Sequence, residues 1–333
     1  MSVRALAAMA AKNPVEPYSY EAAALSPTDV EIEISHCGIC HSDLNVIAND
    51  WATSVYPLVP GHEIVGKIAK AGAESGFSLG QRVGVGWQRS ACLTCALCLA
   101  GHENLCAKQQ AICVGHPGGF ADRIVTDGRF VFAIPDALGS AETAPLLCGG
   151  VTVFAPMRRY GVTAGSSVGV IGIGGLGHLA LRFLRAMGCE VTAFSSTPEK
   201  REESQQLGAH QAASSTEVRD IRKHAGRFDL LLSTVPARLD WITFIQTLKP
   251  NGVLCLVGAP PGLLQLPAGP LLTGQKTIAG SDIGSRAMIR EMLEFSTAHK
   301  IGAQIETAPM SDANLALDRL RKNDVRYRMV LTN

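Results

Sequence analysis

The sequence has no surplus of charge of either sign and no cluster of basic residues. Its 333 residues include 30 Lys and Arg against 29 Asp and Glu, which gives a formal net charge of +1. Binding to a phosphate backbone or to an anionic membrane requires a run or patch of Lys and Arg. We therefore expect neither a nucleic acid nor a membrane as a partner.

Long apolar segments and internal repeats are also missing. No stretch reaches the ~18 to 20 apolar residues that are needed to span a bilayer. Residues 1–11 superficially resemble a signal peptide, because Arg4 precedes small and apolar residues. This apolar run is too short and too rich in alanine, however, and the first strand of a domain explains it equally well. We predict a cytoplasmic protein.

Two regions with different hydrophobic patterns divide the chain, in which 47% of the residues are hydrophobic. Up to about residue 135, short alternating runs separated by Gly and Pro predict an antiparallel, barrel-like β region. After residue 145, strands alternate with helices, which predicts a parallel α/β sheet. The expected elements are strands at 30–34, 64–68, 82–85, 167–173, 189–194, 229–233, 253–257 and 327–331, and helices ending near 188, at 238–249 and at 284–300.

A glycine-rich loop follows the first strand of the α/β region. The sequence from 172 to 177 fits G-x-G-x-x-G, directly after a predicted strand and at the start of a predicted helix. Such glycines let the backbone turn tightly and approach a pyrophosphate, whose charge is favoured at a helix N-terminus. The expected dinucleotide contacts are Gly172, Gly174, Gly175, Leu176 and Gly177.

The end of the next strand indicates which dinucleotide is bound. An NAD-selective fold carries Asp or Glu at this point to hold the ribose hydroxyls. Here Ser195 and Ser196 leave room for a 2′-phosphate, and Lys200 and Arg201 supply positive charge. We predict NADP(H). The alternative is that Glu199 or a backbone group binds the ribose.

Ten cysteines are many for a protein in a reducing compartment, and their clustering suggests metal binding. Four of them, Cys92, Cys95, Cys98 and Cys106, lie within fifteen residues. Four sulfur ligands at this spacing suit a closed tetrahedral zinc site. An iron–sulfur cluster is the competing interpretation, because C-x-x-C-x-x-C also begins ferredoxin motifs. Neither site would leave an open position for chemistry.

A second set of ligand types is spread over the first 148 residues. It consists of Cys40 in Gly-Ile-Cys-His-Ser-Asp at 38–43, the neighbours His62 and Glu63, and Cys148 just before the nucleotide fold. A mixed set of two thiolates and one imidazole can bind zinc and keep a position open for an oxygen. Each residue alone is weak support, since a buried Cys is usually just a small hydrophobic residue.

Together these motifs resemble the zinc-containing medium-chain alcohol dehydrogenases, and most closely their cinnamyl alcohol dehydrogenase-like branch. The resemblance covers the whole chain. It rests on the segments already quoted and on Cys-Gly-Gly-Val-Thr-Val at 148–153 and Val-Arg-Tyr-Arg at 325–328. It implies a GroES-like, β-rich catalytic domain at 1–147 and 285–333, with a zinc lobe at 92–106. A Rossmann domain at 148–284 would bind NADP(H).

The resemblance also implies roles for individual residues. Cys40, His62 and Cys148 would hold a catalytic zinc, with Glu63 beside it as an alternate ligand, and the four-cysteine lobe would hold a second zinc. Cys37 would then be structural. Ser42 would pass the proton of the alcohol onward, and Thr152 would contact the nicotinamide. The expected reaction is hydride transfer between NADP(H) and a primary alcohol/aldehyde pair.

One position departs from the family pattern. Where many relatives have a His that continues the proton relay, this chain has Asn45. An amide cannot shuttle a proton near neutral pH, so we predict that the relay ends in water, in the ribose hydroxyls or in Asp50.

Two alternative functions are compatible with parts of the sequence. A zinc-free quinone or enoyl reductase of the same fold would not need this ligand set, and neither would a metal-stabilised redox sensor that keeps a nucleotide fold. The sequence does not name the substrate, although the branch suggests aromatic or medium-length aliphatic aldehydes. Trp51, Trp87, Ile112 and Ile283 are candidate pocket residues. By analogy with relatives we expect a homodimer or homotetramer.

Overall fold

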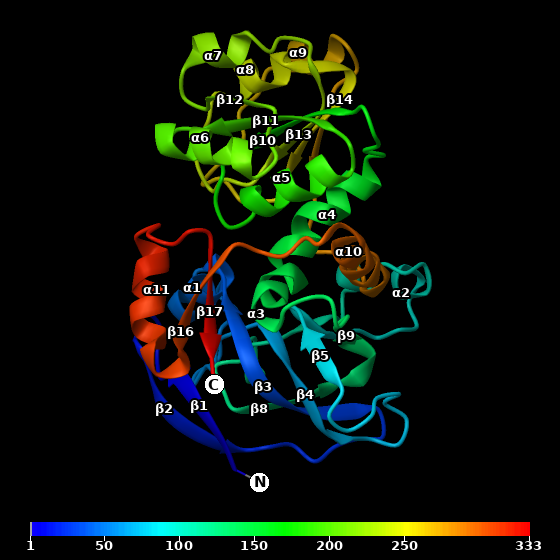
Figure 1. The fold of residues 1–333 in the computed structure, drawn as a ribbon, viewed down its shortest axis with the longest axis vertical. Coiled ribbons are helices and arrows are strands. Elements are labelled where there is room, and N and C mark those ends of the chain that lie inside the picture. Colours follow the sequence, from blue (N-terminus) through cyan, green and yellow to red (C-terminus); the bar gives the residue numbers. More distant parts are fainter. Residues whose placement is uncertain (1) are drawn as a thin grey trace. The chain divides into compact units, whose positions relative to one another are not determined.

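The computed structural model describes residues 2–333, and these divide into two compact units. The first unit contains the residues up to Val151 and those from Gly284 to Asn333, and the second contains Thr152–Ile283 (Figure 1). The second unit is therefore an insertion into the first. None of the helices in the described chain is both long enough and apolar enough to cross a membrane.

The first unit is built on a seven-stranded sheet. Its strands run in the order β16-β17-β3-β4-β5-β9, and β8 also pairs with β3. All pairs are antiparallel except β16 with β17. The strands are β3 (Asp29–Ile39), β4 (Glu63–Ala71), β5 (Arg82–Val85), β8 (Arg123–Asp127), β9 (Val131–Ala133), β16 (Ile305–Pro309) and β17 (Arg328–Thr332). Two ribbons accompany the sheet, formed by β1 (Ser2–Ala8) with β2 (Val15–Glu21) and by β6 (Gln88–Ser90) with β7 (Gln110–Ala111).

Short helices connect these strands, and α11 lies beside β16 and β17 (Figure 1). The helices that lie wholly in this unit are α1 (His41–Ala48), α2 (Ala96–Leu99), η1 (Glu103–Leu105), η2 (Gly128–Phe130), α3 (Ser140–Thr143), η3 (Ala144–Leu147), α10 (Arg286–His299), η4 (Met310–Asp312) and α11 (Ala313–Arg321). The period-two pattern of β3 sets the core, because Val30, Ile32 and Ile34 are buried while Glu33 is exposed.

The second unit has a six-stranded sheet in which every pair is parallel. The order β12-β11-β10-β13-β14-β15 is the 3-2-1-4-5-6 order of a Rossmann fold. The strands are β10 (Ser167–Ile171), β11 (Glu190–Ser195), β12 (Gln211–Ser214), β13 (Phe228–Ser233), β14 (Leu248–Leu256) and β15 (Thr277–Gly280). The helices are α5 (Gly177–Ala186), α6 (Pro198–Gln206), α7 (Val218–Arg222), α8 (Trp241–Gln246) and α9 (Gly269–Leu272), while α4 (Gly149–Arg159) joins the two units.

The predicted parallel α/β sheet is confirmed, but one predicted helix is too long. The sequence pattern predicts a helix at 238–249, whereas α8 begins at Trp241 and ends at Gln246. Asp240 caps its start, because the Asp240 carboxylate accepts a hydrogen bond from the backbone N–H of Thr243. Leu248 already pairs with Phe228 as the first residue of β14, so the sheet ends the helix early.

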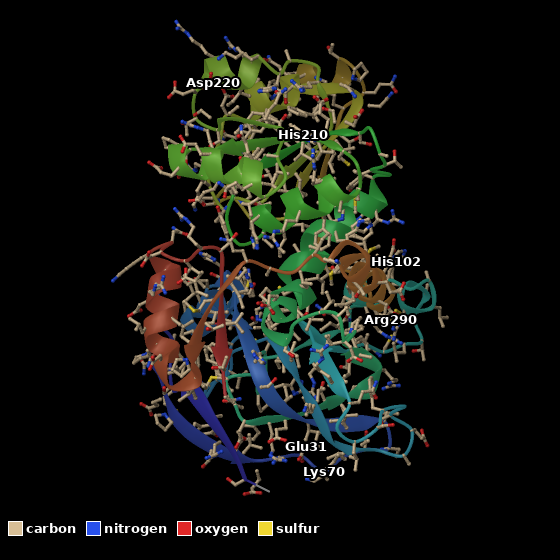
Figure 2. All side chains as sticks on the ribbon, viewed as in Figure 1. Glu31, Lys70, His102, His210, Asp220 and Arg290 are labelled. Atoms are coloured by element: carbon tan, nitrogen blue, oxygen red, sulfur yellow. The ribbon has the colours of Figure 1, made fainter. Side chains whose placement is uncertain are left out.

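Glu31 is the exception to the alternation in β3, because it is a buried acid. Its carboxylate accepts hydrogen bonds from Lys70 Nζ at 2.7 Å and from Arg123 Nη1 at 2.9 Å. Figure 2 labels Glu31 and Lys70 at the end of the sheet. Burial by itself would raise the pKa of Glu31, but the two cations outweigh it and hold the pKa below its ordinary value of 4.5.

We expect Glu31→Gln to lower the free energy of unfolding by about 1–3 kcal/mol at pH 7. Because the folded pKa is depressed, this stabilisation is complete above the unfolded pKa and is lost as the pH falls through the folded one. Thermal melts of the wild type and the variant should therefore differ most at neutral pH and converge in acid. Glu33→Gln, an exposed neighbour on the same strand, is the control. If the melting temperatures of the wild type and Glu31→Gln differed by the same amount at all pH values, the stabilisation would not depend on ionisation of Glu31.

Candidate active site and metal centres

The turn from β3 into α1 positions the first candidate ligand. Cys40 is the N-cap of α1, and its backbone N–H donates to the Asp43 carboxylate at 2.9 Å, which completes a capping box. The hydroxyl oxygen of Ser42 lies 3.8 Å from Cys40 Sγ and is half-buried. The local sequence therefore fixes the thiol and places a hydroxyl beside it.

The start of β4 brings His62 and Glu63 to the same place. Gly38 pairs with Glu63 across β3 and β4, and a Cβ atom at Gly38 would lie only 2.1 Å from Glu63 Oε2, so a larger residue would displace the carboxylate. The imidazole of His62 is oriented by Asp43, whose Oδ1 accepts from His62 Nδ1 at 2.9 Å. Since a carboxylate only accepts, Nδ1 carries the proton and Nε2 is left to act as a ligand.

The four predicted ligands meet in one buried cluster. One ligand atom each from Cys40, His62, Glu63 and Cys148 lie within 4.8 Å of one another. His62 Nε2 and Glu63 Oε2 have no hydrogen-bond partner anywhere in residues 2–333, although both atoms are buried. Buried polar atoms are nearly always paired. These groups could therefore hold a metal cation, and soft thiols with an imidazole suit zinc.

The charges in this cluster are strongly coupled. The interaction between the two thiols holds the pKa of Cys40 well below its usual value and that of Cys148 well above it. Burial raises the pKa of Glu63 to about 7, although the guanidinium of Arg328 opposes the shift. Arg328 is itself buried and forms an ion pair with Glu63. The cluster therefore combines three acidic groups with one fixed cation.

Aromatic side chains border the cluster. The ring of Trp87 lies edge-on to that of His62, with 4.9 Å between centroids, and Trp51 lies edge-on to Trp87 at 5.8 Å. Cys113 is buried, and its sulfur lies within 4.8 Å of one ring nitrogen of His62 and one carboxylate oxygen of Asp43. Of the other two candidate pocket residues, Ile112 lines a different cavity and Ile283 belongs to the second unit.

The four-cysteine lobe forms a separate sulfur cluster. All four Sγ atoms lie within 4.8 Å of one another, with separations of 3.8 Å for Cys92–Cys98, 3.9 Å for Cys95–Cys106 and 3.5 Å for Cys92–Cys106. Hydrogen bonds from the backbones of Thr94 and Cys95 lower the pKa of Cys92 to about 5. Three of the four leucines of the lobe, Leu97, Leu99 and Leu105, are exposed and Leu93 is half-buried, so the sulfur atoms occupy the place of a core.

In the second unit, β10 runs into the glycine-rich loop as predicted, and α5 begins at Gly177. A Cβ at Gly177 would lie 1.9 Å from the carbonyl oxygen of Gly172, and Gly172 has a φ of +91°. Both glycines are therefore required by the backbone. Nothing lies within 4 Å of a Cβ built at Gly174. Protein packing does not demand that glycine.

At the end of β11, the two serines predicted to bind the cofactor differ in their exposure to solvent. Ser195 is buried, and its hydroxyl oxygen accepts from the backbone N–H of Thr197 at 3.2 Å, whereas Ser196 is exposed. Arg201 donates to the carbonyl oxygen of Ser195 at 3.3 Å, and Lys200 is half-buried on α6. Ser196 is thus the more accessible hydroxyl.

Three further candidates lie outside the clusters. Thr152 is buried on α4 and is the first residue of the second unit. Asp50 is exposed and lines an open cavity with Lys12 and Arg321, and no ligand of either cluster lines that cavity. The backbone N–H of Asp50 donates to the carbonyl oxygen of Asn45 at 2.9 Å. The roles of Thr152, Asp50 and Asn45 stay predictions.

Comparison with known proteins agrees with this arrangement. The family model described as "Alcohol dehydrogenase GroES-like domain" matches residues 26–136, and "Zinc-binding dehydrogenase" matches residues 175–298. The chain belongs to the zinc-binding alcohol dehydrogenase family. Both the GroES-like domain and the Rossmann sheet of the predicted fold are confirmed, and so is the resemblance to the cinnamyl alcohol dehydrogenase-like branch.

Relatives of this dehydrogenase include reductases and alcohol dehydrogenases. It is 44% identical to the aldehyde reductase AdhA of Synechocystis sp. over 99% of both chains. A probable cinnamyl alcohol dehydrogenase of Oryza sativa is 42% identical over 98% of this chain and 93% of its own. A cinnamyl alcohol dehydrogenase structure from Sorghum bicolor has a TM-score of 0.96 at 40% identity, covering 100% and 98% of the chains. A Helicobacter pylori relative, solved with NADP(H), has a TM-score of 0.92 at 30% identity over 100% and 98%.

Three residues that contact the ligand cluster of this dehydrogenase were not predicted from the sequence. Asp43 orients His62, and its position three residues after the N-cap is a capping-box signal that points to it. Arg328 belongs to a quoted motif, but its ion pair with Glu63 spans 265 positions and has no local signal. Cys113 also gives no local sign that it approaches His62.

Proposed function

We propose that the protein is a zinc-dependent alcohol dehydrogenase that uses NADP(H) and acts mainly as an aldehyde reductase. The observation that carries this proposal is the buried cluster of two thiols, one imidazole and one carboxylate, with His62 Nε2 and Glu63 Oε2 left unpaired. Two thiolates and a carboxylate carry three negative charges. A dication together with Arg328 would balance them, which is the condition for burying such a set.

In this proposal Cys40, His62 and Cys148 hold the zinc, and Glu63 is an alternate ligand. When bound, the zinc acts as a Lewis acid towards the oxygen of the alcohol or aldehyde, and the nicotinamide gives or takes the hydride. Asp43 keeps the imidazole in one tautomer and orientation. Arg328 favours the ionised form of Glu63 and so opposes the effect of burial, which favours the protonated form.

Ser42 is the proposed proton carrier. Its hydroxyl lies next to Cys40 and both accepts and donates, so it can take the proton of an alcohol and pass it on. Beyond Ser42 the relay would end in water, in ribose hydroxyls or in Asp50, since Asn45 cannot shuttle a proton. Exposure of Asp50 to solvent supports exchange of its proton with water.

We assign a second zinc to the four-cysteine lobe. Four thiolates at the Zn–S distance of about 2.3 Å in a tetrahedron are about 3.8 Å apart. The observed separations of 3.5 to 3.9 Å support zinc over an iron–sulfur cluster, because a cluster places several atoms between its thiolates. This zinc would be structural.

The glycine loop supports the dinucleotide assignment. Since packing does not require a glycine at 174, close approach of a pyrophosphate to the backbone explains it better. Thr152 is the proposed nicotinamide contact. The proposed domain roles are catalysis for 1–147 and 285–333 and nucleotide binding for 148–284. These limits differ by up to four residues from those of the compact units.

The proposed substrates are aromatic or medium-length aliphatic aldehydes and their primary alcohols. The edge-to-face pair of Trp87 and Trp51 next to His62 offers an apolar wall for such groups. A homodimer or homotetramer remains the proposed assembly by analogy with relatives. The ten cysteines are all free, which supports a reducing compartment such as the cytoplasm.

The first test is the loss of reduced-cofactor absorbance with an aromatic aldehyde, run with NADPH and with NADH. We expect a preference for NADPH, and Ser196→Asp should lower kcat/KM with NADPH at least about tenfold, because a charge-assisted contact to the 2′-phosphate is replaced by repulsion. The NADH reaction should change little. Ser311→Asp, an equally exposed site in the first unit, is the control.

An NADH preference of the wild type would overturn the cofactor assignment and leave the enzyme class intact. Absence of activity with either cofactor, across several aldehydes and with two zinc ions bound, would contradict the dehydrogenase proposal itself.

A further inference from the structure

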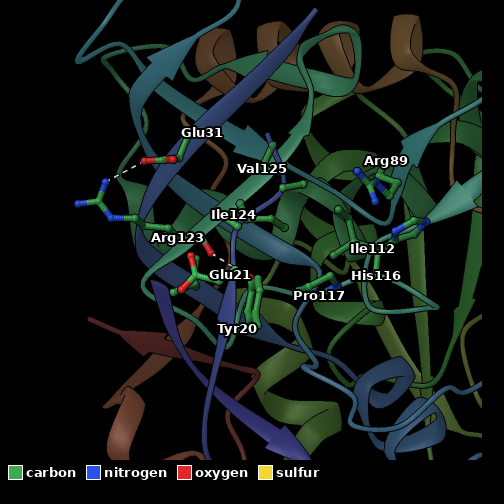
Figure 3. Close-up of a pocket in the computed structure, with 13 residues that line it drawn as sticks. Tyr20, Glu21, Glu31, Arg89, Ile112, His116, Pro117, Arg123, Ile124 and Val125 are labelled. Atoms are coloured by element: carbon green, nitrogen blue, oxygen red, sulfur yellow. Dashed lines mark hydrogen bonds and ion pairs between the residues drawn. The ribbon is translucent and has the colours of Figure 1, made fainter. Parts of the chain in front are cut away.

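A small pocket lies in the first unit, away from both metal clusters. Its volume is about 180 Å³, well below the roughly 300–1,000 Å³ of sites for drug-sized ligands. It lies between the end of β2, the loop that follows β7, and β8, and none of the proposed metal ligands lines it (Figure 3). A ligand that fits it must be small.

Arg89 is the unusual residue of this pocket. Its Nε is buried and has no hydrogen-bond partner in residues 2–333, and no ion pair of its guanidinium is found in that range either. The other arginine in the wall, Arg123, is paired with Glu31 at 2.9 Å. Burial lowers the pKa of Arg89, and the charges of Asp29 and Asp127 oppose this shift although neither acid forms an ion pair with it. The side chain as a whole is half-buried, but a buried Nε–H group without an acceptor is costly unless a ligand supplies one.

The acidic groups nearby do not fill this role. Glu31 is held by Lys70 and Arg123, and Asp127, outside the pocket wall, is held by Arg129. Glu21 is exposed at the rim, and Asp29 uses its carboxylate to accept from the backbone N–H of Ser26. All these acids have contacts of their own, and Arg89 keeps its positive charge facing the pocket.

His116 and an apolar wall complete the pocket. Burial, and then the charge of Arg89, lower the pKa of His116, so near neutral pH the ring is uncharged and offers one N–H donor. Figure 3 shows Arg89 and His116 on the same side of the pocket, with Ile112 beside them. The apolar wall is made of Val3, Ile112, Pro117, Ile124 and Val125.

We propose that this pocket binds a small organic carboxylate. Arg89 and His116 donate to its two oxygens, and its apolar part lies against Ile112 and Ile124. One guanidinium that forms no ion pair and one neutral donor match a monoanion better than a phosphate dianion. The planar guanidinium fits the two oxygens of a carboxylate.

The test uses the full-length protein with its zinc and isothermal titration calorimetry, with benzoate as the probe. Benzamide, the uncharged analogue, and inorganic phosphate are the comparison ligands. We expect saturable binding of benzoate at one site per chain, and weakening by about tenfold or more in Arg89→Met. Arg89→Lys should weaken binding less, because the charge is kept. Arg219→Met, at an exposed arginine of the second unit, should bind as the wild type does.

A further variant separates this pocket from the proposed catalytic zinc, which could also bind a carboxylate. Cys148→Ser should leave benzoate binding unchanged if the pocket is the site. Loss of binding in Cys148→Ser, or equal affinities of Arg89→Met and the wild type, would overturn the proposal. So would absence of benzoate binding, or equal or tighter binding of benzamide or phosphate. If Arg89→Met does not fold, Arg89→Lys and His116→Phe provide the same comparison.

Discussion

Cys148→Ser should lower kcat/KM for aldehyde reduction by about a thousandfold or more. Lewis-acid stabilisation is worth several kcal/mol, and each 1.36 kcal/mol is a factor of ten in rate. The hydroxyl of serine is a much poorer zinc ligand than a thiolate at neutral pH. Because the thiol of Cys148 lies within 4.8 Å of that of Cys40 and shifts its pKa, the change perturbs two of the proposed ligands at once. Steady-state kinetics and the zinc content of the purified variant measure the effect.

Cys37→Ala is the matched control. Cys37 is also buried and lies on the same strand that leads to Cys40, but its sulfur is not part of the ligand cluster. We expect it to keep both zinc ions and most of the activity while losing some stability from a small cavity. If Cys148→Ser retained wild-type activity with one zinc missing, the assignment of the catalytic zinc would be wrong.

Removal of one cysteine of the four-cysteine lobe should lower the stability of the protein and change its catalytic activity much less. We expect Cys98→Ala to reduce the zinc content from two ions to one per chain and to lower the melting temperature by roughly 10 °C. This temperature shift assumes that the free energy of unfolding falls by several kcal/mol and that each kcal/mol lowers the melting temperature by about 2–4 °C. The reason is that the lobe has exposed leucines and no apolar core, so the four sulfur atoms and their metal must hold it.

The control for the lobe is Cys189→Ala, which truncates a buried cysteine of the second unit. It should keep two zinc ions and show only the small loss expected of a core truncation. Zinc analysis by mass spectrometry and thermal melts distinguish the two variants. A Cys98→Ala protein that melts like Cys189→Ala would show that the lobe is not held by metal.

Features that arise from neighbouring residues could be predicted from the sequence. The glycine loop is recognisable because its three glycines, between a strand and a helix, have the spacing that close approach of a pyrophosphate requires. In the structure β10 and α5 flank it as expected. The four cysteines of the lobe lie close in sequence, so their proximity in space follows from the length of the loop. The alternation at 30–34 predicts the buried face of β3. In each case the signal and its cause lie within about twenty residues.

Features that depend on sheet register could not be predicted in this way. Arg328 reaches Glu63 only because β17 pairs with β3 and β3 pairs with β4. The alternating pattern of β3 predicts that its apolar residues are buried and that Glu31 faces solvent. The burial of Glu31 could therefore not be predicted from this pattern. The lack of an ion pair at Arg89 could not be predicted from the sequence either, because it depends on the contacts that each nearby acid makes in the folded protein.

The position of β17 between β16 and β3 determines when the first unit can fold during protein synthesis. The second unit is one continuous stretch and can fold as soon as it has left the ribosome. The first unit must wait for residues 328–333, because β17 pairs with both β16 and β3 and carries Arg328 to Glu63. Until then β3 keeps an open edge between His36 and Ile39, available to other strands. The surroundings of the ligand cluster are therefore completed only after the whole second unit has been synthesised.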